Sequence, residues 1–186
     1  IDLDPEMITL FDGSDIDLPV DVRAKLLRFN EESLLSPKSE IIVGDAFNEV
    51  ERLVSEGRFF DTIIVDLPDP SHPDLNKLYT DYFYTRLREL LSADGAIAIQ
   101  STSPYHAPKA FFSVGKTLDA AGFQTEQYHA NVPSFGEWGW TIGTIAGLKP
   151  SERIARYNAL PLPHDLLSIE QINVAFVFAP NFYMRA

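Results

Sequence analysis

Asp66 and Asp69 are the two residues of this chain whose type and spacing best suit chemistry. They follow an apolar run over residues 63–65, which is typical of a buried strand in a parallel sheet. In open α/β sheets, ligands bind outside the carboxyl ends of such strands. Two carboxylates at that place suit a cationic substrate, and either one could accept a proton from it. The alternative is a turn in which the aspartates cap backbone amides, and the residues alone leave both interpretations open.

Further acidic residues end two strands that are predicted earlier in the chain. Asp2 and Asp4 lie at the end of a strand over residues 1–3. Asp2 is a candidate for binding ribose hydroxyls, as acidic residues at strand ends of nucleotide-binding folds do, whereas Asp4 is better explained as a helix cap. Asp45, followed by Ala46, ends a strand over residues 40–44. Asp45 could accept a hydrogen bond from an adenine amino group, but helix capping is the stronger interpretation of this residue alone.

An aromatic segment over residues 132–140 is a candidate pocket wall, because it contains Phe135, Trp138 and Trp140. Aromatic rings beside carboxylates suit an alkylammonium chain through cation–π and apolar contact. Packing in the core is the alternative, and we expect it for at least one of the tryptophans. Other phenylalanines are predicted to be core residues, among them Phe111, Phe112, Phe176 and Phe178.

The elements that position these residues alternate between strand and helix, which is the pattern of an α/β fold. Apolar periodicity and capping signals predict helices over residues 5–11, 20–30, 45–55, 80–91 and 108–121. Strands are expected over residues 1–3, 40–44, 61–65, 96–100, 124–130 and 141–148, the last two as an antiparallel pair. A turn is expected at residues 93–95, and residues 150–186 form a tail that ends in an apolar stretch over 174–178.

Composition excludes several classes of protein. The chain has 186 residues, which suits one domain, and a net charge of −12, which argues against nonspecific binding to nucleic acid or anionic membrane. It has no cysteine, and its four histidines show no metal-ligand spacing, so we expect no disulfide, thiolate or metal site. No apolar run approaches the roughly 20 residues that span a bilayer, and no signal peptide is visible. Because the first residue is Ile1, we expect the chain to be part of a longer protein.

Five segments in order resemble the spermidine synthase (polyamine aminopropyltransferase) family, in particular the bacterial branch whose synthase domain follows a membrane-embedded region. The segments are DLDPEM (2–7), VGDAF (43–47), FDTIIVDLPDP (60–70), QSTSP (100–104) and VPSFG (132–136). The resemblance implies a Rossmann-like, methyltransferase-type, three-layer α/β fold that lacks its first strand and glycine-rich loop. It further implies an incomplete catalytic domain over residues 1–150 and a C-terminal extension over residues 151–186.

The reaction implied by the resemblance transfers an aminopropyl group from decarboxylated S-adenosylmethionine to putrescine or a related amine, which gives spermidine and methylthioadenosine. Carried over residue by residue, Asp66 matches the general base that deprotonates the attacking amine. Asp69 matches the carboxylate that binds the amine, and Gln100 lies in a matching segment as a further substrate contact. Phe135 falls where the family often has a substrate-contacting tyrosine.

On the nucleoside side, the resemblance assigns Asp2 to the ribose and Asp45, with Ala46 beside it, to the adenine. It implies small-molecule substrates, an amine and a nucleoside sulfonium, with neither a nucleic acid partner nor a metal or separate cofactor. It also implies a homodimer, and a cytoplasmic domain of a protein of the inner membrane.

The chain departs from the family pattern between its two aspartates, where Leu67 and Pro68 replace small hydroxyl residues, and at Phe135, which has no hydroxyl. Two rival functions therefore stay open. One is a methyltransferase on the same fold that uses S-adenosylmethionine. The other is a non-catalytic domain that binds a polyamine or a nucleoside.

Overall fold

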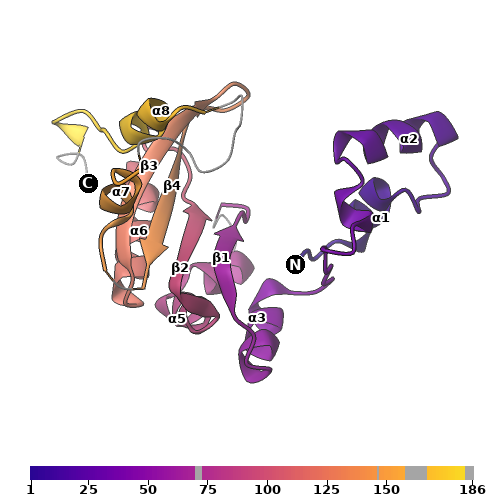
Figure 1. The fold of residues 1–186 in the computed structure, drawn as a ribbon, viewed down its shortest axis with the longest axis horizontal. Coiled ribbons are helices and arrows are strands. Elements are labelled where there is room, and N and C mark those ends of the chain that lie inside the picture. The colour runs from indigo at the N-terminus through magenta and orange to yellow at the C-terminus, as the bar shows by residue number, and fades with distance from the viewer. Residues whose placement is uncertain (70–72, 146, 158–166, 183–186) are drawn as a thin grey trace. The chain divides into compact units, whose positions relative to one another are not determined.

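The computed structural model describes residues 1–69, 73–145, 147–157 and 167–182. The chain divides into two compact units, Ile1–Glu56 and Gly57–Ala186, and each is described by itself. Figure 1 shows their elements, with the first unit in indigo to purple and the second in magenta to yellow. Among the described residues, every helix is too short or too polar to cross a lipid bilayer.

The first unit contains α1 (Pro5–Asp12), α2 (Val20–Phe29), the short 3-10 helix η1 (Ser33–Leu35) and α3 (Ala46–Ser55). Helix α1 begins as predicted, because the Asp4 carboxylate accepts the Glu6 N–H at 2.9 Å and Pro5 occupies the first helical position. The two strands predicted over residues 1–3 and 40–44 are reduced to one parallel bridge between Asp2 and Val43.

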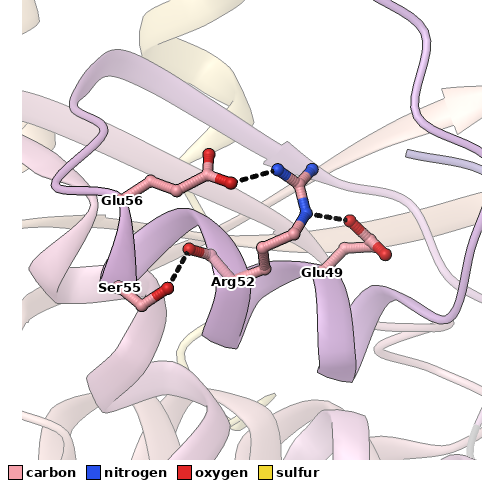
Figure 2. Close-up of polar contacts among 4 residues, drawn as sticks. All are labelled: Glu49, Arg52, Ser55 and Glu56. Carbon is pink, nitrogen blue, oxygen red and sulfur yellow. Dashed lines mark hydrogen bonds and ion pairs between the residues drawn. The ribbon is translucent and has the colours of Figure 1, made fainter.

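Helix α3 is amphipathic and buries Val50 and Leu53. Phe47 and Val54 of the same helix are half-buried. Figure 2 shows the solvent side of α3, where Arg52 donates to Glu49 at 2.8 Å and to Glu56 at 2.6 Å. These pairs lie three and four residues apart, which is the spacing at which side chains meet on a helix surface.

The second unit is built on a four-stranded mixed sheet in the order β1-β2-β4-β3. Its strands are β1 (Phe60–Val65), β2 (Leu91–Gln100), β3 (Gln124–Val132) and β4 (Gly136–Thr144). Strands β1 and β2 are parallel, and β2–β4 and β4–β3 are antiparallel. The predicted α/β class and the antiparallel pairing of the last two strands are therefore confirmed.

Two boundaries within this sheet were predicted wrongly. The turn expected at residues 93–95 lies inside β2, as a bulge where the register jumps from the Phe60–Leu91 pair to the Thr62–Ala96 pair. Strand β4 begins at Gly136 rather than at residue 141, so most of the aromatic segment is one arm of a hairpin.

Helices cover both faces of the sheet, which makes three layers (Figure 1). Helix α6 (Pro108–Ala120) packs on β4 through Phe111 and Leu118, which lie directly over Gly139 and Gly143. Helix α8 (Ile169–Ala175) lies over the opposite face, beside Tyr128 and Trp140. The remaining helical segments of the second unit are α4 (Pro73–Asn76), η2 (Lys77–Tyr79), α5 (Asp81–Glu89) and α7 (Pro150–Ile154).

An aromatic cluster ties the C-terminal segment to α6. The Phe182 ring, 1% exposed, lies 5.2 Å from Phe112 and 4.6 Å from Phe178, measured between centroids. Phe111 and Phe112 are buried, as predicted, and Phe178 packs against them partly buried. Phe176 is half-buried against Tyr128, with ring centroids 5.6 Å apart.

Candidate active site

Asp66 and Asp69 lie where the sequence predicted, just beyond the carboxyl end of β1. Val65, the last residue of the strand, is buried, whereas both aspartates are exposed. Strand β2 runs parallel to β1 and ends at Gln100. The ends of parallel neighbouring strands meet at one edge of a sheet, so Gln100 lies beside the aspartates.

The Asp69 carboxylate is held by one donor on each oxygen. Gln100 Nε2 donates to Oδ1 at 3.2 Å, and Thr102 Oγ1 donates to Oδ2 at 3.0 Å. An ionised carboxylate only accepts, which fixes the orientation of the Gln100 amide with its NH₂ toward Asp69. In the described part of the chain, these side-chain bonds to Asp69 favour the site interpretation over backbone capping.

Gln100 has an acceptor that is left over. Its Oε1 is buried and has no hydrogen-bond partner among the described residues. A buried acceptor without a donor is costly, and such groups are commonly completed by a ligand or an ordered water. Oε1 belongs to the same amide group as the Nε2 that donates to Asp69. An N–H group from a ligand would therefore suit both Oε1 and the Asp69 carboxylate.

Tyr79 fixes the backbone between the two aspartates. Its hydroxyl donates to the Pro68 carbonyl at 2.9 Å and lies 3.3 Å from the Leu67 carbonyl. Burial, and then the negative charges of Asp69 and Asp66, raise the pKa of Tyr79 to about 12. The phenol therefore stays protonated at neutral pH and remains a donor.

Tyr84 is a neighbour of Tyr79 and lies in the core. It is 0% exposed, and its hydroxyl has no partner within the described residues. Burial, and then the neighbouring Tyr79, raise the pKa of Tyr84 well above its ordinary value. The two tyrosines thus differ in function, because only the Tyr79 hydroxyl bonds to the loop that carries the aspartates.

Sequence analysis missed both Tyr79 and Thr102. The partners of Tyr79 are backbone carbonyls, which no pattern of side chains reveals. Thr102 lies in one of the segments that carried the family resemblance, but its contact with Asp69 joins residues 33 positions apart. The segment could have drawn attention to Thr102, whereas the hydrogen bond required the structure.

The predicted nucleoside residues lie together in the first unit. The Asp2 N–H donates to Ile42 O at 3.0 Å and the Gly44 N–H donates to Asp2 O at 2.8 Å, so Asp2 and Asp45 end two neighbouring parallel segments. Asp45 caps α3 by accepting the Phe47 N–H at 2.9 Å, which confirms the capping interpretation. Ala46 is the first residue of that helix. Asp2 accepts the Asp4 N–H at 2.9 Å.

The aromatic segment divides between two environments. Phe135 is 64% exposed at the tip of the β3–β4 hairpin, with its ring 5.5 Å from that of Trp138. Trp140 stacks on Tyr128 at 5.4 Å, and both rings line a groove of about 910 Å³ beside α8. Trp138 and Trp140 are both half-buried, so neither belongs to the buried core. Trp140 also pairs in register with Gln100, so the two side chains share one face of the sheet.

Among the described residues, no group of three or more histidine, aspartate or glutamate side chains is placed to bind a metal ion. The described polar residues at the end of β1 are instead carboxylates, an amide and hydroxyls, contributed by Asp66, Asp69, Gln100, Thr102 and Tyr79. This arrangement can bind a cationic, N–H-bearing ligand and can accept a proton from it.

Comparison with known proteins agrees with this chemistry. A family model described as "Spermine/spermidine synthase domain" matches residues 3–153. The polyamine aminopropyltransferase of Shewanella oneidensis is 52% identical over 186 residues, which is 100% of this chain and 32% of that protein. The polyamine aminopropyltransferase 1 of Streptomyces coelicolor is 37% identical over 131 residues, which is 70% of this chain and 24% of that protein.

The fold is also shared with a solved structure, the spermidine synthase from Thermotoga maritima. Its TM-score is 0.62 at 22% identity, over 89% of this chain and 55% of that one. The chain spans about a quarter to a third of the length of the curated relatives that it matches. On the extent of the family match and the identity to these relatives, the chain belongs to the spermine/spermidine synthase family.

Proposed function

We propose that the protein containing this chain transfers an aminopropyl group from decarboxylated S-adenosylmethionine to putrescine or a related amine. The products are spermidine, or its homologue, and methylthioadenosine. The observation that carries the proposal is the pair Asp66 and Asp69 at the carboxyl end of β1, with the Asp69 carboxylate oriented by Gln100 and Thr102. The curated relatives named polyamine aminopropyltransferases support it.

Asp66 is the proposed general base. An alkylammonium has a pKa near 10.4, so at neutral pH almost every amine is protonated and has no lone pair for attack. Asp66 is exposed at the strand end and accepts that proton as the amine approaches. The nitrogen then bonds to the aminopropyl carbon attached to the sulfonium. The C–S bond breaks, its electron pair stays on sulfur, and neutral methylthioadenosine leaves.

Asp69 is the proposed binding carboxylate for the amine. Each of its oxygens already accepts one neutral donor, and each keeps a lone pair for an ammonium group. The unpartnered Gln100 Oε1 supports a second N–H contact to the same ligand. Phe135, at the exposed hairpin tip, is proposed to contact the alkyl chain.

Asp2, Asp45 and Ala46 are proposed to bind the nucleoside, with Asp2 on the ribose and Asp45 with Ala46 near the adenine. Their place at the ends of neighbouring parallel segments supports this role. A spermidine synthase of similar fold, with a TM-score of 0.63, has been solved in complex with the transition-state analogue AdoDATO. The sulfonium already activates the carbon under attack, so the proposed reaction calls for no metal or further cofactor.

The proposed organisation is a catalytic domain over residues 1–150 and a C-terminal extension over residues 151–186. The family match, which ends at residue 153, supports this division. So does the packing of Phe178 and Phe182 on α6. A homodimer, and a cytoplasmic domain that follows a membrane-embedded region of an inner-membrane protein, are further proposals from the family resemblance.

The proposal is tested in a chimaera, in which these 186 residues replace the matching segment of the Shewanella oneidensis relative. The chain itself and the unmodified relative are assayed beside it. Decarboxylated S-adenosylmethionine is offered with putrescine, cadaverine or spermidine, and products are identified by mass spectrometry. We expect methylthioadenosine and a longer polyamine from the chimaera.

Two other results would decide against the proposal. A folded chimaera that binds putrescine and methylthioadenosine but forms no product would favour the non-catalytic binding domain, as Leu67 and Pro68 between the aspartates do. A methylated amine formed from S-adenosylmethionine would favour the methyltransferase.

A further inference from the structure

Thr102 has a backbone conformation that its side chain does not favour. Its φ is 62°, in the left-handed region, although threonine is β-branched, and the residue is only 7% exposed. The other non-glycine residues with positive φ in the described ranges, Glu31 and Glu32, are exposed in the connection before η1. A buried β-branched residue in this region is an outlier that the surrounding structure must enforce, and such strain clusters at functional sites.

Gly139 enforces this conformation. Its N–H donates to Thr102 O at 2.9 Å, and its carbonyl accepts the Ser101 N–H at 2.9 Å, so the β2–β4 ladder continues beyond the Gln100–Trp140 pair. A Cβ at position 139 would lie 2.8 Å from Phe111 Cδ2 and 3.0 Å from Thr102 O. Glycine therefore lets β4 approach the Thr102 backbone closely enough to hold it.

The strained residue delivers one hydroxyl to Asp69. Thr102 Oγ1 bonds to Oδ2, while Gln100 bonds to Oδ1 from two residues earlier. Ser101 between them is 1% exposed and bonds instead to Thr141 Oγ1 at 2.9 Å, which anchors the turn in the core. The two donors thus come from one anchored segment and fix both oxygens of the carboxylate.

We infer that Thr102 is a positioning residue for Asp69, held in its left-handed conformation by Gly139. The inference rests on the part of the proposed function that assigns amine binding to Asp69, because it gives Thr102 the role of orienting that carboxylate. A turn that served the fold alone would gain nothing from the hydroxyl, so removing the hydroxyl separates the two roles.

The first test measures the affinity of the chimaera for putrescine by calorimetry in three variants. Thr102→Val keeps the shape and loses the hydroxyl, and we expect binding about 10-fold weaker, as for a lost hydrogen bond to a charged group. Thr102→Ser keeps the hydroxyl and binds as the wild type does. Thr102→Gly also binds about 10-fold more weakly, yet its thermal midpoint is not lowered, because glycine adopts positive φ freely.

A matched pair of glycines on β4 provides the control. A Cβ at Gly143 would lie 3.0 Å from Leu118 Cδ2 and 3.2 Å from Ile97 Cγ2, whereas one at Gly139 would meet the Phe111 ring and, in addition, Thr102 O at 3.0 Å. We expect both Gly139→Ala and Gly143→Ala to lower the thermal midpoint. Only Gly139→Ala weakens putrescine binding, and affinity for methylthioadenosine changes in neither.

Equal putrescine affinity in the unsubstituted chimaera (the wild type of this test) and in its Thr102→Val variant would overturn the inference. Equal losses of putrescine affinity in the Gly139→Ala and Gly143→Ala variants would also overturn it. Turnover is measured separately from binding. A wild type that binds putrescine but transfers no aminopropyl group ends the proposed function and leaves this inference standing. A wild type that binds no putrescine overturns both.

Discussion

Replacing Tyr79 with phenylalanine removes the hydroxyl that bonds to the loop between Asp66 and Asp69. One proton is shared between the Pro68 carbonyl at 2.9 Å and the Leu67 carbonyl at 3.3 Å, so one net hydrogen bond is lost. We expect the free energy of unfolding to fall by about 0.5–1.5 kcal/mol at neutral pH. Urea denaturation of the 186-residue chain, followed by circular dichroism, measures this change.

The same substitution makes a prediction about alkaline pH. The pKa of Tyr79 is raised from its model-peptide value of 10.0 to about 12 in the folded chain. Below pH 10 the phenol is neutral in both states, and its stabilisation is fully present. Between about pH 10 and 12 the unfolded chain releases the proton while the folded chain retains it, so stability is lost as pH rises.

The wild type therefore loses its advantage over Tyr79→Phe in that window, by on the order of 1 kcal/mol near pH 11 after a discount for partial exposure. Burial also raises the pKa values of Tyr84 and Tyr128, and because burial is common to both proteins its effect cancels in the difference. The part of the Tyr84 shift that comes from Tyr79 is smaller than the part from burial. The difference in unfolding free energy is measured at several pH values from neutral to alkaline.

Tyr84→Phe is the matched control, because the Tyr84 hydroxyl is buried without a partner within the described residues. Its removal leaves stability unchanged or raises it by about 1 kcal/mol. The reasoning is refuted if the two phenylalanine variants have equal stability, or if the advantage of the wild type over Tyr79→Phe does not change with pH.

Three further substitutions test individual elements of the two units by thermal and urea denaturation. Thr80→Ala removes the cap that accepts the Phe83 N–H at 3.1 Å and should cost about 1 kcal/mol, whereas no change would mean that α5 does not depend on this cap. Phe182→Ala removes a side chain that is 1% exposed and should lower the free energy of unfolding by about 3–5 kcal/mol. A decrease typical of a surface residue would show that the C-terminal segment does not pack on α6. Arg52→Ala breaks both exposed ion pairs of α3 and should lower the midpoint slightly at low salt and not at high salt; an equal loss at both would exclude an ionic cause.

The place of the candidate site could be predicted from the sequence because its signal is local. An apolar run over residues 63–65 stops at two carboxylates, and the structure ends β1 at Val65, directly before Asp66. The strand predicted over residues 96–100 ends at Gln100, as β2 does, whereas the contact between Gln100 and Asp69 came from the structure. The predicted burial of β1 was wrong, however: Val65 is buried, but Ile64 is 76% exposed, because β1 lies at the edge of the described sheet.

The start of β4 could not be predicted, because its cause lies elsewhere in the chain. Glycines and aromatic residues over 136–143 are typical of a loop by composition. In the structure, Gly139 and Gly143 lie in the strand because the Phe111 and Leu118 side chains of α6 leave no room for a Cβ. Only the packing of α6 on the sheet reveals that requirement.

Tyr79 and Thr102 were missed for a related reason. Tyr79 acts on backbone carbonyls 11 and 12 residues away, and Thr102 acts on a carboxylate 33 residues away. The left-handed conformation of Thr102 runs against the preference of its residue type. The residues that hold the two aspartates in place are thus revealed only by tertiary contacts, whereas the aspartates themselves were visible in the sequence.

The division of roles between Asp66 and Asp69 is the central claim, and steady-state kinetics of the chimaera test it most directly. Asp66→Asn should lower kcat by about 10²–10⁴-fold, as expected for loss of a general base, with putrescine affinity retained. Asp69→Asn should instead weaken putrescine binding, with the folded state of both variants confirmed by circular dichroism. Undiminished turnover in Asp66→Asn, or an unchanged putrescine affinity in Asp69→Asn, would contradict the assignment of base and binding carboxylate.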